Sequence, residues 1–289
     1  MPDSLKRLQP YVERALKCWL PPENKGDDLV RAMHYSVLGG GKRLRPILAL
    51  LACQAVSGNV EPALPAGCAV EMIHAYSLIH DDLPCMDDDD LRRGRPTTHK
   101  VFGEAMAVLA GDALQTLAFA ILTDPKNGYR DEQSVSMARE LARAAGYRGM
   151  VGGQAKDIGK TAHDLDTLAR LHREKTGAIF KAAVTLGAIA AGASDRERKA
   201  LAGYAEAFGL AFQIMDDVLD VVGDPAKMGR YKGSDEAAGR ATYPGMIGVE
   251  ASRRRAQQSV EQGRDALMSL SQPAAELDEL LTFVLTRDT

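Results

Sequence analysis

Apolar residues recur at three- and four-residue spacing along most of the chain, which is the pattern of amphipathic or buried α-helices. The alternation of period two that is typical of β-strands is scarce. The pattern predicts helices over residues 28–38, 43–57, 66–83, 102–122, 131–147, 164–191, 195–222, 241–263 and 272–286. Stretches rich in glycine and proline, such as LGGGK, RRGRPTT, TDPKNG and GGQAKDIGK, separate these segments and are predicted to be turns or loops.

These segments predict an all-α fold of about nine or ten packed helices. Low aromatic content (5%) and frequent alanine suit closely packed helices. No repeat of solenoid period appears, and no linker is long enough to divide the chain. We therefore expect a single domain over residues 1–289.

Composition and charge indicate which partners and which cellular compartment to expect. The chain has 36 basic and 39 acidic residues, and a balance so near zero gives no reason to expect a nucleic-acid partner. The four cysteines show neither C-x-x-C nor zinc spacing, which favours a reducing compartment. The N-terminus lacks the apolar core of a signal peptide, and the run AMAVLAGDALQTLAFAIL is interrupted by Asp112. We expect a cytoplasmic protein with no membrane span.

The stretch HDDLPCMDDDDLRR, residues 80–93, concentrates six carboxylates within ten residues. On a helix over 66–83, His74, Ser77 and Asp81 share one face. Pro84 should end or kink this helix, and the bend that follows is expected to bring Asp87 back beside Asp81. Carboxylates at this density suit Mg²⁺ or Mn²⁺. A solvated acidic loop is the alternative for this stretch taken alone.

A second cluster, FQIMDDVLD, lies in a strongly apolar setting. Gln213, Asp216, Asp217 and Asp220 are related by helical spacing and are expected to form one polar stripe. Carboxylates on an apolar helix are costly unless they are paired or bind a metal. Two clusters of this kind predict metal ions shared across a cavity between helices.

Basic residues stand close to both clusters in a way that suits a polyanion. The segment GGGKRLRP opens a helix with three cations, Arg92 and Arg93 follow the first cluster, and Lys175-Thr176 lies in an apolar setting. Backbone N–H groups in glycine-rich turns, together with Lys and Arg side chains, hold phosphate oxygens. The aspartate carboxylates are thus expected to bind metal ions, and the metal ions are expected to bind a diphosphate.

With these motifs in this order, the sequence resembles the trans-polyprenyl diphosphate synthases, and most of all the bacterial farnesyl diphosphate synthase group. The resemblance runs from GGGKRLRP through EMIHAYSLIHDDLPCMDDDDLRRGRPTTH, AGDALQTLAF, GGQAKD, HREKTG and FQIMDDVLDVVGD to ATYP. It implies a helical bundle around a deep cavity, usually a homodimer. It also implies three Mg²⁺ ions, or Mn²⁺ in their place, with isopentenyl diphosphate and an allylic diphosphate as substrates.

The resemblance assigns roles to particular residues. The expected metal ligands are Asp81, Asp87 and Asp216, with Asp82, Asp217 and Asp220 close by. The expected contacts of isopentenyl diphosphate are Lys42, Arg45, His74 and Arg93. The allylic diphosphate is expected to meet Arg92, Lys175 and Thr176, with Gln213 near the reacting carbons and Gln154 and Asp157 lining the pocket.

Two positions depart from the family pattern. The family commonly carries two lysines after the second motif, and the matching positions here are Arg230 and Arg240. Charge is kept, but arginine and lysine differ in reach and geometry. Lys227 and Lys232 lie near the first of these positions, so the match there stays open.

The implied reaction is ionisation of the allylic diphosphate, attack by the double bond of isopentenyl diphosphate, and loss of a proton to the released diphosphate. A bulky ring at Tyr76, five residues before Asp81, with small Ser77 after it, resembles enzymes that stop at the C15 product. The alternatives are geranylgeranyl or geranyl diphosphate synthase and, less favoured, a terpene cyclase or a non-catalytic synthase subunit. The intact isopentenyl-side set argues against a cyclase, and two complete aspartate motifs argue against a non-catalytic subunit.

Overall fold

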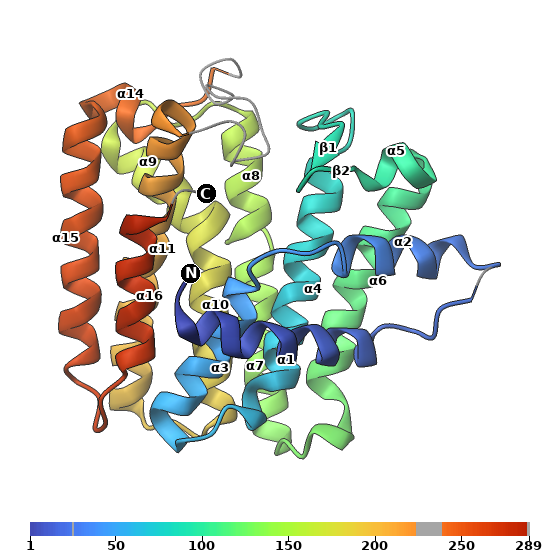
Figure 1. The fold of residues 1–289 in the computed structure, drawn as a ribbon, viewed down its shortest axis with the longest axis horizontal. Coiled ribbons are helices and arrows are strands. Elements are labelled where there is room, and N and C mark those ends of the chain that lie inside the picture. The colour runs from blue at the N-terminus through green and yellow to red at the C-terminus, as the bar shows by residue number, and fades with distance from the viewer. Residues whose placement is uncertain (25, 224–238, 288–289) are drawn as a thin grey trace.

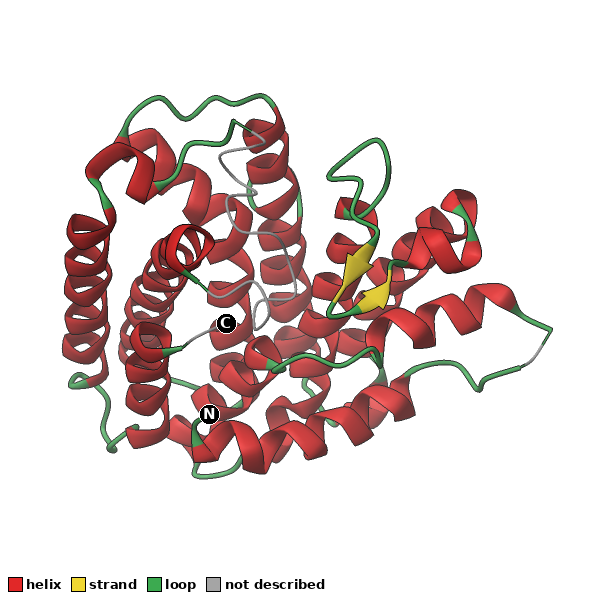
Figure 2. Cartoon of the chain, turned by 45° about the horizontal axis from the view of Figure 1, so that its top comes forward, coloured by secondary structure: helices red, strands yellow, loops and turns green. Residues whose placement is uncertain are grey.

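Helices account for nearly all regular structure in residues 1–24, 26–223 and 239–287, which are the residues that the computed structural model describes (Figure 2). The all-α prediction is confirmed. The first half of the chain contains α1 (Asp3–Trp19), α2 (Asp28–Val37), α3 (Leu44–Ser57), α4 (Leu64–Asp81), α5 (Thr98–Phe102), α6 (Glu104–Thr123) and α7 (Asp131–Ala145). The second half contains α8 (Met150–Ile158), α9 (Leu165–His172), α10 (Ala178–Ala190), α11 (Asp195–Val222), α14 (Tyr243–Ile247), α15 (Val249–Leu267) and α16 (Ala275–Thr286).

The long helices run side by side, and α1 and α2 cross them (Figure 1). Helix α4 packs against α3 and α6, α10 packs against α3, α7 and α11, and α11 packs against α15. The helices α4 and α11, which carry the two aspartate clusters, therefore belong to one packed set through α3 and α10.

A buried aromatic cluster fills the space between α10 and α11. Phe180, Phe208 and Tyr204 are fully buried, and the rings of Phe180 and Phe208 meet edge to face with centroids 5.2 Å apart. Phe212 adds a tilted contact with Phe180 at 5.0 Å. Such pairs contribute about 0.5–1.5 kcal/mol each beyond the burial of their area. This cluster fixes α11 against α10 close to the second aspartate motif.

Five segments differ from the sequence prediction. The predicted helix 241–263 is divided at Gly248 into α14 and α15, and α15 continues to Leu267. The stretch GGQAKDIGK, predicted to be a break, contains most of α8. The amphipathic N-terminus, not included among the predicted helices, forms α1. The predicted helix 164–191 is interrupted by a π-helical turn, η3 (Arg173–Gly177), between α9 and α10. A short antiparallel hairpin, β1 (Leu91–Arg92) and β2 (Arg95–Pro96), begins one residue before the RRGRPTT stretch and lies mostly within it.

Helix α6 is long and apolar enough to cross a membrane by length and composition, although one such helix is weak evidence because core helices pass the same test. It packs along α4 and also contacts α2 and α7. Ala107, Gly111 and Leu114 are among its buried residues. Its role within the described residues is that of a packed core helix.

Candidate active site

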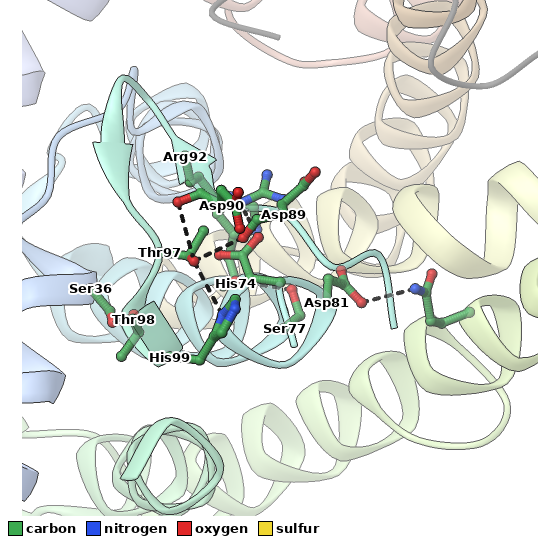
Figure 3. Close-up of polar contacts among 12 residues, drawn as sticks. Ser36, His74, Ser77, Asp81, Asp89, Asp90, Arg92, Thr97, Thr98 and His99 are labelled. Atoms are coloured by element: carbon green, nitrogen blue, oxygen red, sulfur yellow. Dashed lines mark hydrogen bonds and ion pairs between the residues drawn. The ribbon is translucent and has the colours of Figure 1, made fainter. Parts of the chain in front are cut away.

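The first aspartate cluster lies where α4 ends. Asp81 is the last residue of the helix and Asp82 is its C-cap, so the helix ends shortly before Pro84, as predicted (Figure 3). Beyond the proline the chain turns back, and the Asp87 backbone N–H donates to the Asp81 carbonyl oxygen at 2.9 Å. This bond brings Asp81 and Asp87 together, although six residues separate them in the sequence.

Asp81, Asp82 and Asp87 each meet a donor from a different part of the chain. Asp81 Oδ1 accepts a hydrogen bond from Gln154 on α8 at 2.9 Å (Figure 3), and Asp82 Oδ1 accepts one from Arg92 Nε at 2.6 Å. Asp87 is paired with Arg240. Burial raises the pKa of Asp81 and of Asp82 to about 6, because a carboxylate removed from water holds its charge less readily. These are negative groups that a bound cation would stabilise.

The members of the second cluster lie on α11 at the predicted spacing, and the two neighbouring aspartates meet different partners from other elements. Asp216 is half-buried and accepts from Arg287 at 3.3 Å. Asp217 is buried, and its carboxylate accepts from Gln213 Nε2 at 3.2 Å and from the Tyr243 backbone N–H at 3.0 Å. Asp220 is buried as well. Asp216 is thus the carboxylate of this motif that is most open to a ligand.

Beside Asp217 lies His172, whose Nε2 is 3.8 Å from Asp217 Oδ2 and whose ring contacts Tyr243. Burial lowers the pKa of His172 from 6.5 to about 4, because the charged imidazolium loses its hydration. The unfolded chain therefore takes up a proton near pH 6.5, whereas the folded protein does so only near pH 4. Stability from this group is complete above pH 6.5 and is lost as the pH falls from 6.5 to 4.

We expect His172→Gln to remove this pH dependence. At about 1.4 kcal/mol per pKa unit, the loss in the parent amounts to roughly 3 kcal/mol. The free energy of unfolding in urea, measured for parent and variant from pH 7 to pH 4, checks this. The comparison is needed because the raised pKa values of Asp81 and Asp82 act in the opposite direction in both proteins. Parallel pH curves for the two proteins would contradict the prediction.

The π-helical turn positions the groups expected at the allylic diphosphate. Lys175 lies in η3, and its Nζ donates to Asp157 Oδ2 of α8 at 2.6 Å. Arg240 reaches the same carboxylate, with Nε 3.5 Å from Asp157 Oδ2. Thr176 lies in the same turn and is half-buried. Asp157 thus holds two cations, Lys175 and Arg240, near Asp81 and Asp87.

Gly153 allows this arrangement because α8 and η3 approach closely. A Cβ at Gly153 would lie 2.3 Å from the Lys175 backbone nitrogen, so any side chain there must push the π turn away. We expect Gly153→Ala to destabilise the protein by about 1–3 kcal/mol and to weaken binding of the allylic diphosphate. Gly128→Ala in an open turn tests only backbone strain and serves as the control, because nothing lies within 4 Å of its Cβ position. Unchanged unfolding and allylic KM in Gly153→Ala would contradict the predicted contact.

Two of the groups expected at isopentenyl diphosphate, Arg45 and His74, meet between α3 and α4. Arg45 Nη1 lies 3.2 Å from His74 Nε2, and its guanidinium stacks over the Phe180 ring at 4.6 Å. Burial lowers the pKa of Arg45 to about 10 and, with the nearby arginines, keeps the pKa of His74 well below 6.5. His74 is therefore a neutral partner for Arg45.

The remaining two members of this set, Arg93 and Lys42, lie at the glycine-rich loop. Arg93 donates to the Gly40 carbonyl oxygen. Gly41 has φ +120°, and a Cβ there would lie 2.6 Å from the Arg93 guanidinium carbon, so glycine is required. Lys42 Nζ lies 5.9 Å from the centre of the Phe283 ring on α16. A pocket with about 500 Å³ of empty space, open to solvent, adjoins His74 and Arg93.

The residues expected to set product length lie one turn below Asp81. Tyr76 is buried, its ring packs edge-on against His80 with centroids 5.7 Å apart, and its hydroxyl has no hydrogen-bond partner. Ser77 is half-buried and donates to the His74 carbonyl oxygen at 2.9 Å. Tyr76 is therefore a fixed apolar ring beneath the first cluster.

Arg287, which follows α16, also reaches the site and was not predicted from the sequence. Its guanidinium lies 3.9 Å from the centre of the Phe212 ring and contacts Asp216. The only signal in the sequence was a lone arginine near the C-terminus. Arg230, Lys227 and Lys232 lie outside the described residues.

Comparison with known proteins decides the family. A sequence model described as Polyprenyl synthetase matches residues 27–277. The chain belongs to the polyprenyl synthetase family. It is 46% identical to the farnesyl diphosphate synthase of Escherichia coli over 99% of both chains. It is also 47% identical to geranylgeranyl pyrophosphate synthase 11 of Arabidopsis thaliana, over 89% of this chain and 74% of that protein.

Solved structures of polyprenyl synthases agree with this family assignment. The crystal structure of an FPP/GFPP synthase from Zymomonas mobilis matches with a TM-score of 0.86 and 41% identity, covering 98% of this chain and 97% of that one. Geranylgeranyl pyrophosphate synthetase from Pyrococcus horikoshii matches with a TM-score of 0.88 and 27% identity over 98% and 97% of the two chains. The helical bundle is thus that of the isoprenoid synthases, as the motifs predicted.

Proposed function

We propose that this protein condenses isopentenyl diphosphate with dimethylallyl and then geranyl diphosphate to give farnesyl diphosphate and diphosphate. One observation carries the proposal: carboxylates at the end of α4 and on α11 lie among cations from separate parts of the chain, which are Arg92 of the hairpin, Lys175 of η3, Arg240 and Arg287. Such a site suits two diphosphates held side by side. The high identity to a farnesyl diphosphate synthase over nearly the full length supports the same reaction.

The carboxylates suit Mg²⁺ by their chemistry, and we propose that Asp81, Asp87 and Asp216 hold it, with Asp82 and Asp220 in support. Among the described residues no group of three or more acid, His or Cys side chains forms a ready cage for a metal ion. Magnesium is usually held by one or two carboxylates together with substrate phosphates and water, so an open site is the appropriate kind. Bound Mg²⁺ would neutralise charge on the leaving diphosphate.

The chain's own residues account for the rest of the mechanism. Lys175 and Arg92 would bind the oxygens of the allylic diphosphate, so that its C–O bond breaks with the electron pair leaving on diphosphate. Lys42 and Arg45 would hold isopentenyl diphosphate so that its double bond meets the allylic C1. Buried apolar side chains around Tyr76 exclude water from the allylic cation. The departing diphosphate accepts the proton that the condensed intermediate loses.

We propose C15 as the product, with Tyr76 as the floor of the chain-binding cavity and Ser77 leaving room above it. The similarity to plant geranylgeranyl pyrophosphate synthases makes C20 the alternative. The buried ring of Tyr76 favours the shorter product, because it would occupy the space that a longer prenyl chain needs. His80 packs against this ring.

We further propose that one domain over residues 1–289 acts in the cytoplasm as a homodimer. Helix α6 leaves Leu109 52% exposed and Val108 39% exposed, although its other face packs against α4. An apolar strip of this kind suits contact with a second copy.

The test is incorporation of labelled isopentenyl diphosphate into a product that partitions into organic solvent after dephosphorylation. The protein is first treated with chelator, then given dimethylallyl diphosphate with and without Mg²⁺. We expect incorporation only with Mg²⁺. No incorporation under either condition would contradict the proposed function.

A further inference from the structure

One buried carboxylate lies among the cations of the isopentenyl side. Glu71, on α4, is 3% exposed, and its Oε1 accepts from Arg43 Nη1 at 2.7 Å. Its charge also raises the pKa of Arg45 and of Arg93, against the lowering effect of burial. A buried carboxylate is rarely kept without a paired cation, and here it is the partner of a residue that the proposed reaction does not use.

Arg43 differs from its neighbours Lys42 and Arg45 in the contacts that its guanidinium makes. It is 3% exposed, and its guanidinium makes three contacts: Nε with Glu13 Oε1 at 2.6 Å, Nη1 with Glu71, and Nη2 with the Val37 carbonyl oxygen at 2.6 Å. The planar fork of arginine can meet all three at once, which the single ammonium of lysine cannot. Arg43 therefore joins α1, the end of α2, and α4.

The backbone of Arg43 is unusual as well. It is the N-cap of α3 and has φ 51° and ψ 35°, in the left-handed region that non-glycine residues seldom adopt. Such a conformation persists only where the surroundings hold it. The three guanidinium contacts are the groups that hold it here.

The left-handed backbone at Arg43 sets the directions in which the side chains of Lys42 and Arg45 extend. Lys42 extends toward Phe283 on α16, and Arg45 extends toward His74 on α4. Glu71 and His74 are three residues apart on α4 and so share a face. The Arg43–Glu71 pair thus fixes the start of α3 against the turn of α4 that presents His74 to Arg45.

We propose that Arg43 and Glu71 are positioning residues for the isopentenyl diphosphate site. They touch neither substrate; they hold Lys42, Arg45 and His74 at the spacing that the diphosphate needs. This inference rests on the proposed function. It goes beyond it by assigning a role to a buried ion pair at the pocket that also adjoins His74 and Arg93.

The test compares the two substrates. In Glu71→Gln we expect the KM for isopentenyl diphosphate to rise about 10-fold or more, because small displacements of binding groups are costly. The KM for dimethylallyl diphosphate should change less than about twofold, because its groups lie on other elements. Arg43→Lys, which keeps charge but loses the fork, should give the same split. Glu206→Gln is the matched control: it breaks an exposed pair with Lys181 between α10 and α11 and should change neither KM.

A folding defect is separated from positioning by the double variant Arg43→Met with Glu71→Met. Removing both charges leaves neither member of the fully buried pair unpaired, and Glu13, the other partner of Arg43, is 31% exposed and can be hydrated. This variant should therefore unfold near the parent's temperature and still show the raised KM for isopentenyl diphosphate. Calorimetric binding of isopentenyl diphosphate should weaken by the same factor without turnover. Unchanged binding in the folded variants, or an equal rise in both KM values, would overturn the inference. A parent that binds isopentenyl diphosphate but condenses nothing would instead contradict the proposed function.

Discussion

Asp81→Asn is expected to lower kcat by roughly 10³-fold, because the metal ions that neutralise a leaving diphosphate supply several kcal/mol of transition-state stabilisation. The substitution removes the charge and keeps the shape. Asparagine Oδ1 can still accept the hydrogen bond that Gln154 donates at 2.9 Å. Burial raises the pKa of Asp81 to about 6, so a neutral side chain at this position should not destabilise the fold. Steady-state kinetics at saturating Mg²⁺ measures the effect.

Asp90→Asn is the matched control for this variant. Asp90 belongs to the same acidic run, but its side chain is 75% exposed and pairs with Lys100 at 2.7 Å. Exposed pairs of this kind contribute about 0–1 kcal/mol, so we expect activity within about twofold of the parent. Equal losses in Asp81→Asn and Asp90→Asn would show that the whole run acts by charge alone. That result would contradict a ligand role for Asp81.

Tyr76→Ala is expected to change the main product from C15 to C20 or longer. The ring is buried one turn below Asp81 and is held edge-on by His80, so its removal opens space where a growing prenyl chain would otherwise stop. The change leaves the diphosphate-binding groups in place. The product distribution should therefore change while the total rate of incorporation stays close to that of the parent. Chromatography of the dephosphorylated alcohols gives the distribution directly.

Tyr76→Phe isolates the ring from the hydroxyl. Because the Tyr76 hydroxyl has no hydrogen-bond partner, phenylalanine should fill the same space and keep C15 as the main product. A C15 product from Tyr76→Ala would remove Tyr76 from the length-setting role. A longer product from Tyr76→Phe would show that the ring alone does not set the limit.

Much of the fold follows from local patterns, and the exceptions have physical causes. The helices α2, α3, α7 and α11 agree with the predicted segments to within two residues, because their apolar spacing is regular. Helix α8 was missed because two adjacent glycines look like a break. Gly153 is instead required for close packing on the π turn, a contact with Lys175 that no local pattern reveals.

The parts of the candidate site that could be predicted are those whose functional residues lie close together in the sequence. The bend that returns Asp87 to Asp81 followed from Pro84, and the structure contains it. The second cluster was predicted as one stripe on a helix, and α11 carries it, but the sequence did not indicate that Asp217 accepts from the Tyr243 backbone N–H while Asp216 meets Arg287. These partners lie on α14 and after α16, so only tertiary packing distinguishes the two neighbouring aspartates.

The ion pair of Arg43 and Glu71 shows the same limit. Arg43 stood in the sequence as one of three cations in GGGKRLRP, with nothing to separate it from Lys42 and Arg45. Its inward direction depends on Glu13, Glu71 and the Val37 carbonyl group, which lie on three other parts of the chain. Charge can be counted from a sequence, but the direction of a side chain depends on its partners.

The most direct measurement is the chain length made by the unaltered protein. Purified protein is incubated with Mg²⁺, dimethylallyl diphosphate and labelled isopentenyl diphosphate, and the alcohols are separated after dephosphorylation. Farnesol as the main product is the predicted result. Geranylgeraniol or geraniol as the main product would contradict the C15 assignment and the role of Tyr76. The absence of any condensation product would contradict prenyl transfer by this chain.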